Sequence, residues 1–453
     1  MKIHFIAIGG AVMNNLAVSM VKKGFQVSGS DDEIFDPALS NLRKHGILPA
    51  EPGWFPEKIT LGLDAVILGM HAKPGNPELD RALKLGLKVY SFPEYLYEQS
   101  RDKIRVVIAG SHGKTTITSM IMHVLRHQHI DFDYLVGAKT EGFDIMVRLT
   151  DAPVIVIEGD EYLTSALDPR PKFLHYKPHI ALISGIAWDH INVFPTFSGY
   201  VEQFSLFIKS IEKNGHLVYC QNDPVLRQVV EESGRQDSSL PYAAVESVTE
   251  NGKSWLIRQK PKFEKYPLKI FGNHNMLNIS GAREVCRLLG IKEDDFNSAI
   301  TTFKGASNRL ERIADNGESA VFRDFAHAPS KLKATVESVK AQYPDRKLIA
   351  VMELHTYSSL SREFLSHYRN SMDQADIPVV FFSPHAIALK KLPSISPEDV
   401  IKGFDHPDLK VFTDTAKLEE FIRSCKIDKT NLLMMSSGNF GGIDLQKLCS
   451  EIF

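Results

Sequence analysis

The residues with the clearest chemistry follow a β-branched apolar run at 104–109. They are Gly110, Ser111, His112, Gly113, Lys114, Thr115 and Thr116. Between a strand and a helix, glycines let backbone N–H groups approach phosphate oxygens, and the helix N-terminus adds positive potential. Lys114 can reach the β- and γ-phosphates of a nucleotide, and the Thr115 hydroxyl can bind Mg²⁺. The usual loop has about four residues between its first glycine and the Gly-Lys pair. Here only two separate Gly110 from Gly113, so the sequence predicts a shortened phosphate-binding loop.

An acid and a histidine follow two further apolar runs of the same region. Glu158 comes after VIVI, and His190 comes after IALISGIAWD. Ligands of open parallel sheets bind at the carboxyl ends of strands, so we expect both residues to converge with Lys114 and Thr115 on one crevice. A carboxylate suits a hard Mg²⁺ ion, which predicts a metal site at Thr115, Glu158 and His190. Asp160 and Glu161 are expected to cap a helix or support this site.

The N-terminus carries a weaker nucleotide signal. Gly9-Gly10 follows the apolar run at 2–8, and Asp31 ends the next predicted strand. Gly9 takes the place of the first glycine of a dinucleotide-binding turn, and an acid about 20 residues further on is where such folds contact ribose. The pattern does not say which nucleotide binds.

The elements that position these residues alternate between apolar runs and helical patterns, which predicts an α/β chain of doubly wound sheets. Three blocks follow one another, at 1–103, 104–308 and 309–453. The Asn251-Gly252 pair predicts a hairpin turn. The expected parallel strands are 2–8, 25–31, 64–70, 88–94, 104–109, 152–161, 179–190, 215–220, 320–330, 348–354, 377–384, 408–413 and 431–439.

Composition narrows the class of protein. The chain has 453 residues, 43% of them hydrophobic, a net charge of −2 and four cysteines without CxxC spacing. The charge indicates neither a nucleic-acid nor a membrane surface, and the cysteines fit a reducing compartment. No run approaches the roughly 18 apolar residues of a membrane span. We therefore expect a cytoplasmic protein.

The motifs together resemble those of the Mur ligases, a family of ATP-dependent, amide-forming enzymes of peptidoglycan synthesis and recycling. The resemblance covers essentially the whole chain, in order. IAIGGAVMNNLA and VSGSD resemble the family's UDP-binding opening, and AGSHGKTT resembles its shortened phosphate loop. EGDEY and WDH resemble its magnesium acid and metal-proximal histidine motifs. GNHNMLN resembles its adenine-contacting segment, NRLERI and RDFAHAPS the opening of its C-terminal domain, and SSGNFGGI its closing loop.

The resemblance implies three domains and a role for each site residue. A Rossmann-like UDP-binding domain would span 1–103, a central P-loop ATPase domain 104–308, and a C-terminal Rossmann-like ligase domain 309–453. The implied catalytic residues are Lys114, Glu158, His190 and His327. Contacts to ATP are implied for the loop 110–116 and for His274, Asn275, Asn278, Arg309 and Asp324. Gly9, Gly10 and Asp31 would bind the UDP substrate, and Thr115, Glu158 and His190 would hold Mg²⁺.

The resemblance also separates branches of the family. Residues 158–178 and 353–360 resemble the branch that joins UDP-N-acetylmuramate to the murein tripeptide L-Ala-γ-D-Glu-meso-diaminopimelate in cell-wall recycling. The alternative is the branch that adds L-alanine in de novo synthesis. Two alternatives belong to other classes of function. One is a nicotinamide-dependent oxidoreductase, suggested by the first turn alone, and the other is a catalytically silent nucleotide sensor. The expected partners are the two small-molecule substrates, and the expected state is a monomer or a weak homo-oligomer.

Overall fold

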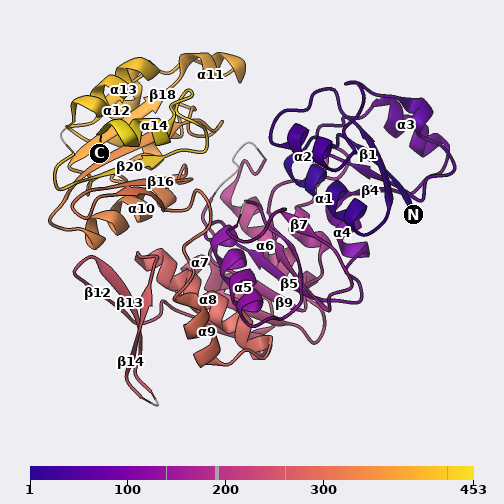
Figure 1. The fold of residues 1–453 in the computed structure, drawn as a ribbon, viewed down its shortest axis with the longest axis horizontal. Helices are drawn as coiled ribbons and strands as arrows, with labels where there is room; N and C mark the ends of the chain where they lie inside the picture. Colours follow the sequence, from indigo (N-terminus) through magenta and orange to yellow (C-terminus); the bar gives the residue numbers. More distant parts are fainter. Residues whose placement is uncertain (139, 189–192, 261, 426, 453) are drawn as a thin grey trace. The chain divides into compact units, whose positions relative to one another are not determined.

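The computed structural model describes residues 1–138, 140–188, 193–260, 262–425 and 427–452 (Figure 1). These residues form four β-sheets and divide into two compact units. The first unit comprises Met1–Ile186, Thr196–Ala243 and Gly281–Ala299, and the second comprises Ala187–Pro195, Ala244–Ser280 and Ile300–Phe453. Because these units divide the chain elsewhere, the three-domain boundaries expected at 103/104 and 308/309 stay predictions.

The N-terminal sheet of the first unit is parallel throughout, in the order β2-β1-β3-β4. Its strands are β1 (Lys2–Ile6), β2 (Gln26–Ser30), β3 (Ala65–Leu68) and β4 (Val89–Ser91). Its helices are α1 (Ala11–Lys22), α2 (Ala38–Lys44), the 3₁₀ turn η1 (Pro56–Lys58), α3 (Pro77–Lys84) and α4 (Phe92–Glu98). Local sequence explains where α3 begins, because Asn76 accepts the backbone N–H groups of Glu78 and Leu79 and Pro77 has no N–H to satisfy.

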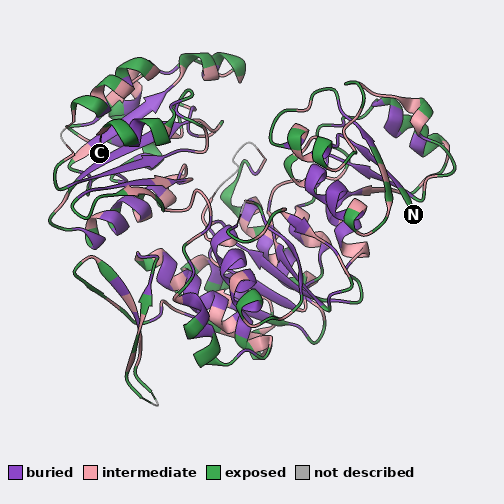
Figure 2. Cartoon of the chain, viewed as in Figure 1, coloured by how far each residue is buried: buried purple, intermediate pink, exposed green. Residues whose placement is uncertain are grey.

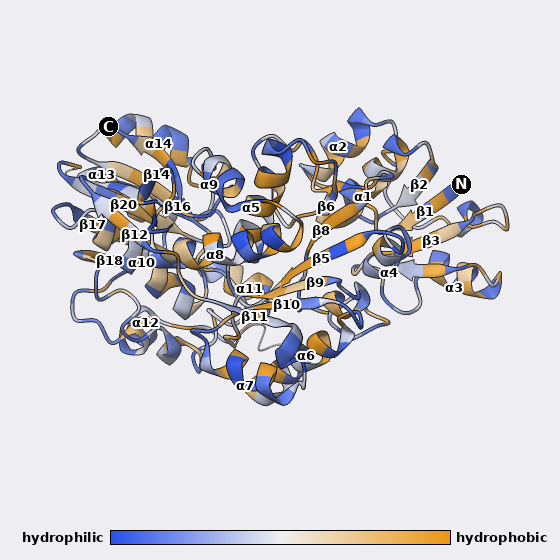
Figure 3. Cartoon of the chain, turned by 90° about the horizontal axis from the view of Figure 1, so that it is seen from below, coloured by the Kyte–Doolittle hydropathy of each residue, from blue (hydrophilic) through white to orange (hydrophobic). Residues whose placement is uncertain are grey.

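A seven-stranded sheet forms the rest of the first unit, in the order β11-β10-β9-β5-β8-β6-β7. Its strands are β5 (Ile104–Ala109), β6 (Asp133–Leu135), β7 (Val147–Arg148), β8 (Val154–Glu158), β9 (Ile180–Ile183), β10 (His216–Cys220) and β11 (Ser239–Tyr242). The central strands β5, β8 and β9 are almost entirely apolar, as a sheet covered on both faces requires (Figure 3). The expected phosphate loop leaves the carboxyl end of β5, between β8 and β9.

Helices cover this sheet and join it to the N-terminal one. They are α5 (Lys114–His127), η2 (Lys172–His175), α6 (Phe197–Ser210), α7 (Pro224–Glu232), η3 (Gln236–Ser238) and α9 (Glu293–Ile300). Within the unit, the side chains of Asn15 and Ser19 on α1 accept the backbone N–H groups of Met146 and Leu149, at 3.0 and 2.9 Å. These bonds fasten the N-terminal sheet to the edge of the seven-stranded one.

The second unit holds a small antiparallel sheet of β12 (Ser247–Glu250), β13 (Lys253–Arg258) and β14 (Glu264–Leu268). Asn251 and Gly252 join β12 to β13 with φ values of 51° and 70°, so the predicted hairpin is confirmed. The helix α8 (Asn273–Leu288) then begins in this unit and ends in the first.

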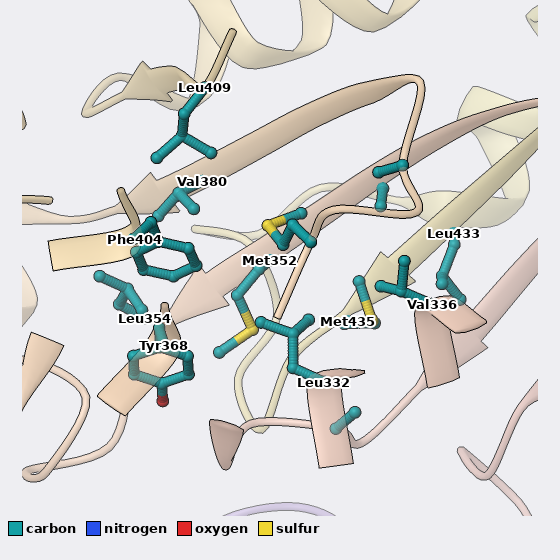
Figure 4. Close-up of a cluster of buried hydrophobic side chains, with 14 of the residues drawn as sticks. Leu332, Val336, Met352, Leu354, Tyr368, Val380, Phe404, Leu409, Leu433 and Met435 are labelled. Carbon is teal, nitrogen blue, oxygen red and sulfur yellow. The ribbon is translucent and has the colours of Figure 1, made fainter. Parts of the chain in front are cut away.

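The C-terminal sheet has the order β15-β16-β20-β17-β18-β19 and is parallel except at β15. Its strands are β15 (Glu311–Asp315), β16 (Ala320–Asp324), β17 (Lys347–Leu354), β18 (Ile377–Phe382), β19 (Lys410–Phe412) and β20 (Thr430–Met435). Its helices are α10 (Pro329–Gln342), η4 (Leu365–Tyr368), α11 (Pro384–Leu389), α12 (Pro397–Phe404), α13 (Thr415–Ser424) and α14 (Leu445–Ile452). Leu332 and Val336 of α10 belong to the same core cluster as Met352 and Met435 (Figure 4).

All thirteen predicted strands are present, and their mixed α/β organisation is that of three doubly wound sheets. The predicted ends of β5, β10 and β17 match the observed ones, whereas β8 and β9 end earlier than predicted, at Glu158 and Ile183, because the residues that follow them belong to loops. The edge strands β7, β11 and β15 and the short strand β6 next to β7 were not predicted. Figure 2 shows strands that are largely buried and helices that carry both buried and exposed residues, as in other layered α/β proteins. No helix in the described part of the chain combines the length and the apolarity that a membrane crossing needs.

Candidate functional site

The predicted phosphate loop lies between β5 and α5. Gly110 has a φ of 119°, and a Cβ placed there would lie 2.8 Å from the backbone nitrogen of Ser184. Gly113, with a φ of 74°, directly precedes the first residue of α5. Both positions therefore require glycine, and the short spacing between them makes a tight turn that points the first N–H groups of α5 out of the sheet.

Lys114 is held at the mouth of this loop by two oxygen atoms. Its Nζ donates to the Gly110 carbonyl at 2.8 Å and to Glu161 Oε2 at 2.6 Å. Glu161 is 1% exposed and the Lys114 side chain 15%. Burial alone would lower the pKa of Lys114, but the negative charges of Glu161 and Asp160 outweigh it and raise that pKa. The ammonium is therefore charged, and it lies where phosphate oxygens would reach a helix N-terminus.

Thr115 and Glu158 meet across the ends of β5 and β8. The Thr115 hydroxyl donates to Glu158 Oε1 at 2.8 Å, and the backbone N–H of Gly137 donates to Glu158 Oε2 at 2.6 Å. A Cβ at Gly137 would lie 2.8 Å from Glu158 Oε1, so glycine is needed for this approach. A hydroxyl and a carboxylate, both oxygen donors, are the chemistry that Mg²⁺ prefers. The structure thus brings together three of the residues expected here, whereas His190 lies outside the described residues.

The residues after Glu158 fold back on themselves. Lys172 Nζ pairs with Asp160 Oδ2 at 2.5 Å, and Asp168 pairs with Arg170 at 2.7 Å. His175 lies 3.3 Å from Asp168, and Glu94 is close to both. Although Glu94, Asp168 and His175 are near enough to share a cation, the Arg170 guanidinium already neutralises Asp168. The loop at 160–176 is therefore held by its own ion pairs.

The residues expected at the base and ribose lie in the second unit, and several are occupied by local bonds. Asn275 Nδ2 donates to the Phe271 carbonyl at 2.8 Å, and Asn275 Oδ1 accepts from Asn278 at 3.3 Å. His274 Nδ1 hydrogen-bonds with Ser338 Oγ at 3.1 Å beside a cavity of about 440 Å³. Burial lowers the pKa of His274, and the charge of Asp324 opposes this effect.

The remaining C-terminal residues cluster near the end of β16. Asp324 accepts from the Thr335 hydroxyl at 2.6 Å. The Arg309 guanidinium lies 4.5 Å from the centre of the Phe325 ring. His327 Nδ1 is 2.9 Å from the Phe325 carbonyl, which favours a proton on Nδ1. Within this unit, His274 at the start of α8 thus lies near enough to Asp324, at the end of β16, to feel its charge, and His327 follows in the loop after that strand.

The N-terminal turn occupies residues 7–10, between β1 and α1, and so includes Gly9 and Gly10. Its left-handed residue is Ala7, with a φ of 64°, whereas Gly9 and Gly10 are not in that conformation. Gly9 donates its N–H to Asp31 Oδ2 at 2.7 Å, and a Cβ at Gly9 would lie 2.8 Å from the same oxygen. Gly9 therefore allows a close approach to Asp31 rather than a left-handed backbone. Burial raises the pKa of Asp31 to about 6, against the opposing effect of the Gly9 bond.

Sequence reasoning missed two residues of the phosphate site. Glu161, expected only as a cap or support, makes a direct ion pair with Lys114. Tyr200, on α6, hydrogen-bonds with both Ser111 and Glu161. The EGDEY motif signals Glu161, but no local pattern marks a single tyrosine 39 residues later.

Comparisons with known proteins agree along the chain. Residues 2–103 match the model "Mur ligase family, catalytic domain", 108–286 the "Mur ligase middle domain", and 308–438 the "Mur ligase, glutamate ligase domain". The match to UDP-N-acetylmuramate–L-alanyl-γ-D-glutamyl-meso-2,6-diaminoheptandioate ligase of Haemophilus influenzae is 26% identical and covers 99% of both chains. UDP-N-acetylmuramate–L-alanine ligase of Clostridium kluyveri is 30% identical over 82% of this chain and 81% of its own.

A solved structure supports the fold over the whole chain. The murein peptide ligase of Psychrobacter arcticus matches with a TM-score of 0.67 at 23% identity, covering 100% of this chain and 98% of its own. The three consecutive family matches therefore agree with the order of the sheets along the chain and with the phosphate site after β5. The chain belongs to the Mur ligase family.

Proposed function

We propose that this ATP-dependent, ADP-forming ligase joins the lactyl carboxylate of UDP-N-acetylmuramate to the amine of L-Ala-γ-D-Glu-meso-diaminopimelate, in peptidoglycan recycling. The observation that carries the choice of substrate is the match to the H. influenzae tripeptide ligase, which runs over 99% of both chains. The segment at 158–178, with its Asp168–Arg170 and Asp160–Lys172 pairs, supports the same branch by its resemblance. The alternative is the L-alanine ligase, supported by the 30% identity to the C. kluyveri enzyme.

The proposed chemistry begins with a carboxylate, which is a poor electrophile. Transfer of the γ-phosphoryl group of ATP onto it makes an acyl phosphate and releases ADP. Attack of the amine on the acyl carbon then forms the amide and releases phosphate. In such transfers the protein mainly positions groups and stabilises charge. Lys114, held at 2.6 Å by Glu161, would direct its ammonium at the transferring oxygens.

Mg²⁺ fits the oxygen donors at the end of β5 and β8. Thr115 and Glu158 would hold it, with His190 near it as the family resemblance implies. When bound, the ion would neutralise charge on the β- and γ-phosphates. The hydrogen bonds from Thr115 and Gly137 orient the Glu158 carboxylate for that task.

The amine must lose a proton to become a nucleophile. We propose His327 and His190 as the candidates for that base. In neutral His327, a proton on Nδ1 directed at the Phe325 carbonyl leaves Nε2 as the basic nitrogen. The remaining proposed contacts are those of the loop 110–116, His274, Asn275, Asn278, Arg309 and Asp324 to ATP, and of Gly9, Gly10 and Asp31 to the UDP substrate.

An amine panel tests the proposal. Purified protein receives ATP, Mg²⁺ and UDP-N-acetylmuramate, together with either the tripeptide or L-alanine, and phosphate release is measured. We expect the tripeptide to be used far faster, with the ligated product identified by mass spectrometry. Reactions without UDP-N-acetylmuramate serve as the control and should release no phosphate above background.

The reverse ranking would identify an L-alanine ligase. If no phosphate is released with either the tripeptide or L-alanine, both proposed reactions are contradicted. We propose that the protein is cytoplasmic, because Cys220, Cys286, Cys425 and Cys449 are all free thiols, as expected in a reducing compartment. We also propose that it is a monomer or a weak homo-oligomer.

A further inference from the structure

Helix α6 places one tyrosine between the phosphate loop and the acid motif. Tyr200 Oη lies 2.8 Å from Ser111 Oγ and donates to Glu161 Oε1 at 3.2 Å. All three residues are at most 2% exposed. A tyrosine hydroxyl has one proton, so Tyr200 donates to Glu161 and accepts the Ser111 proton. One hydroxyl therefore links the loop after β5 to the loop after β8.

The other oxygen of Glu161 holds Lys114. The lysine ammonium has three protons, and among the described residues two of them point at Glu161 and at the Gly110 carbonyl. The third is left for a ligand oxygen at the exposed side of the group. A buried carboxylate that lost its cation would be strongly destabilised, so the Lys114–Glu161 pair should persist when phosphates bind.

We propose that Tyr200 is a positioning residue of the phosphate site, which fixes the Glu161 carboxylate and thereby aims the Lys114 ammonium at the transferring phosphoryl group. This inference rests on the proposed function. It gives α6 a part in the reaction, although none of the sequence motifs that resemble the family lies on this helix. A flexible lysine would otherwise sample several rotamers, and Tyr200 restricts it through one intermediate carboxylate.

The tyrosine ring and its hydroxyl have separable roles. The ring packs edge-to-face on Phe204, with centroids 5.3 Å apart, and Phe204 packs in turn on Phe173. Thr196 caps the helix independently by accepting the Gly199 N–H at 3.2 Å. A phenylalanine at position 200 keeps the ring packing and the cap, and it removes the hydroxyl that links Glu161 to Ser111.

The first test is therefore Tyr200→Phe, measured as phosphate release with ATP, Mg²⁺ and both carbon substrates. Because the ammonium interacts most strongly as charge develops on the phosphoryl oxygens, we expect kcat to fall about tenfold, the size of one lost hydrogen bond at a charged group. KM for UDP-N-acetylmuramate should not change. Tyr95→Phe is the matched control, since the Tyr95 hydroxyl is also buried but has no hydrogen-bond partner among the described residues. It should leave both parameters as in the wild type.

A double-mutant cycle separates positioning from a general structural effect. Glu161→Gln alone should lower kcat more than Tyr200→Phe does. If Tyr200 acts through Glu161, adding Tyr200→Phe to Glu161→Gln should lower kcat by less than about twofold further. Multiplicative losses would overturn the inference, as would a loss of activity that disappears when each variant is assayed well below its own melting temperature.

The outcomes also separate this inference from the proposed function. If the wild-type protein ligates neither amine, the proposed function fails. If the wild type is active and Tyr200→Phe matches it in kcat, only the positioning role fails.

Discussion

Two glycine-containing turns of the first unit have the same construction and opposite charge. Each joins a parallel strand to a helix, β1 to α1 and β5 to α5. In the first turn, the Gly9 N–H is bound by the Asp31 carboxylate at 2.7 Å. In the second turn, the Lys114 ammonium lies at the helix start, 2.6 Å from Glu161. A helix N-terminus attracts anions in both cases, so the side chains decide what each turn can accept.

This difference indicates two kinds of nucleotide chemistry within one unit. A carboxylate at the first turn disfavours a phosphate and suits hydroxyl groups, such as those of a ribose. The cation and the metal-type oxygen donors at the second turn suit a triphosphate whose charge must be neutralised. We propose that the ribose of the UDP substrate lies beside the carboxylate of the first turn and that the triphosphate of ATP lies at the second, an arrangement compatible with these charges.

The largest effect should come from removing the cation of the second turn. We expect Lys114→Ala to lower phosphate release by about 10³-fold, as for other groups that stabilise charge in a transition state. Binding of UDP-N-acetylmuramate, measured by calorimetry, should persist because that substrate is assigned to the first turn. Lys22→Ala, at an exposed position on α1, is the control. Near-normal turnover of Lys114→Ala would remove the distinction between the two turns.

The next largest effect should come from removing one of the proposed Mg²⁺ ligands of the second turn. Thr115→Val keeps the shape of the side chain and removes the hydroxyl that donates to Glu158. We expect the Mg²⁺ concentration for half-maximal activity to rise by about tenfold or more, since a lost ligand contact commonly weakens a metal site by that much. Thr118→Val, on the same helix, removes a buried hydroxyl with no hydrogen-bond partner among the described residues. An unchanged Mg²⁺ requirement in Thr115→Val would contradict the proposed ligand.

The Asp31 carboxylate of the first turn should make the free energy of unfolding depend on pH. Burial raises the pKa of Asp31 to about 6, so the folded state keeps a proton that the unfolded chain has already lost above its ordinary pKa of 3.8. The ionised group therefore lowers the free energy of unfolding above pH 6 and has no such effect below about pH 4.

Asp31→Asn keeps an oxygen for the Gly9 N–H and cannot ionise. Its free energy of unfolding should exceed that of the wild type by about 2–3 kcal/mol at pH 8, and the gain should shrink as the pH falls to 5. Urea denaturation at both pH values, with tryptophan fluorescence as the probe, measures the difference. A gain that is the same at pH 5 and pH 8 would contradict the raised pKa.

The smallest effect concerns the backbone of the first turn. Ala7 is left-handed, with a φ of 64°, a conformation that costs an alanine about 1 kcal/mol. Ala7→Gly should therefore change the free energy of unfolding by no more than about 0.5 kcal/mol, because relief of this strain offsets the greater freedom of the unfolded chain. Ala65→Gly, at a buried position in β3, lacks that compensation and should lower the free energy of unfolding by about 1 kcal/mol. Equal losses in the two variants would show that Ala7 is not strained.

Much of the fold could be read from local patterns. Apolar runs predicted the buried strands β1, β5, β8 and β17, and Asn251-Gly252 predicted its hairpin. The short strands β6 and β7, with three and two residues, were not predicted because so short a segment has no periodicity of its own. Family membership also sets aside the oxidoreductase reading, which the first turn alone allowed.

The candidate site divides in the same way. Lys114, Thr115 and Glu158 were expected together, because Lys114 and Thr115 begin the helix after β5, Glu158 ends the neighbouring parallel strand β8, and parallel strands end at one edge. The first turn includes the predicted Gly9 and Gly10, but its left-handed residue is Ala7, which no sequence pattern signals because alanine rarely adopts that conformation. Asn275 was expected at the base, and its amide is also bonded to Phe271 and Asn278, which no sequence pattern reveals.

The amino-acid sequence by itself determined the order of the sheets, the phosphate loop and the family, because these depend on residues that are neighbours along the chain. Only the tertiary structure decided which partner each charged group has. Glu161 pairs with Lys114 across 47 residues, and Tyr200 reaches Ser111 across 89. Such contacts depend on how strands and helices pack, and packing is set by burial of the whole core rather than by any local spacing.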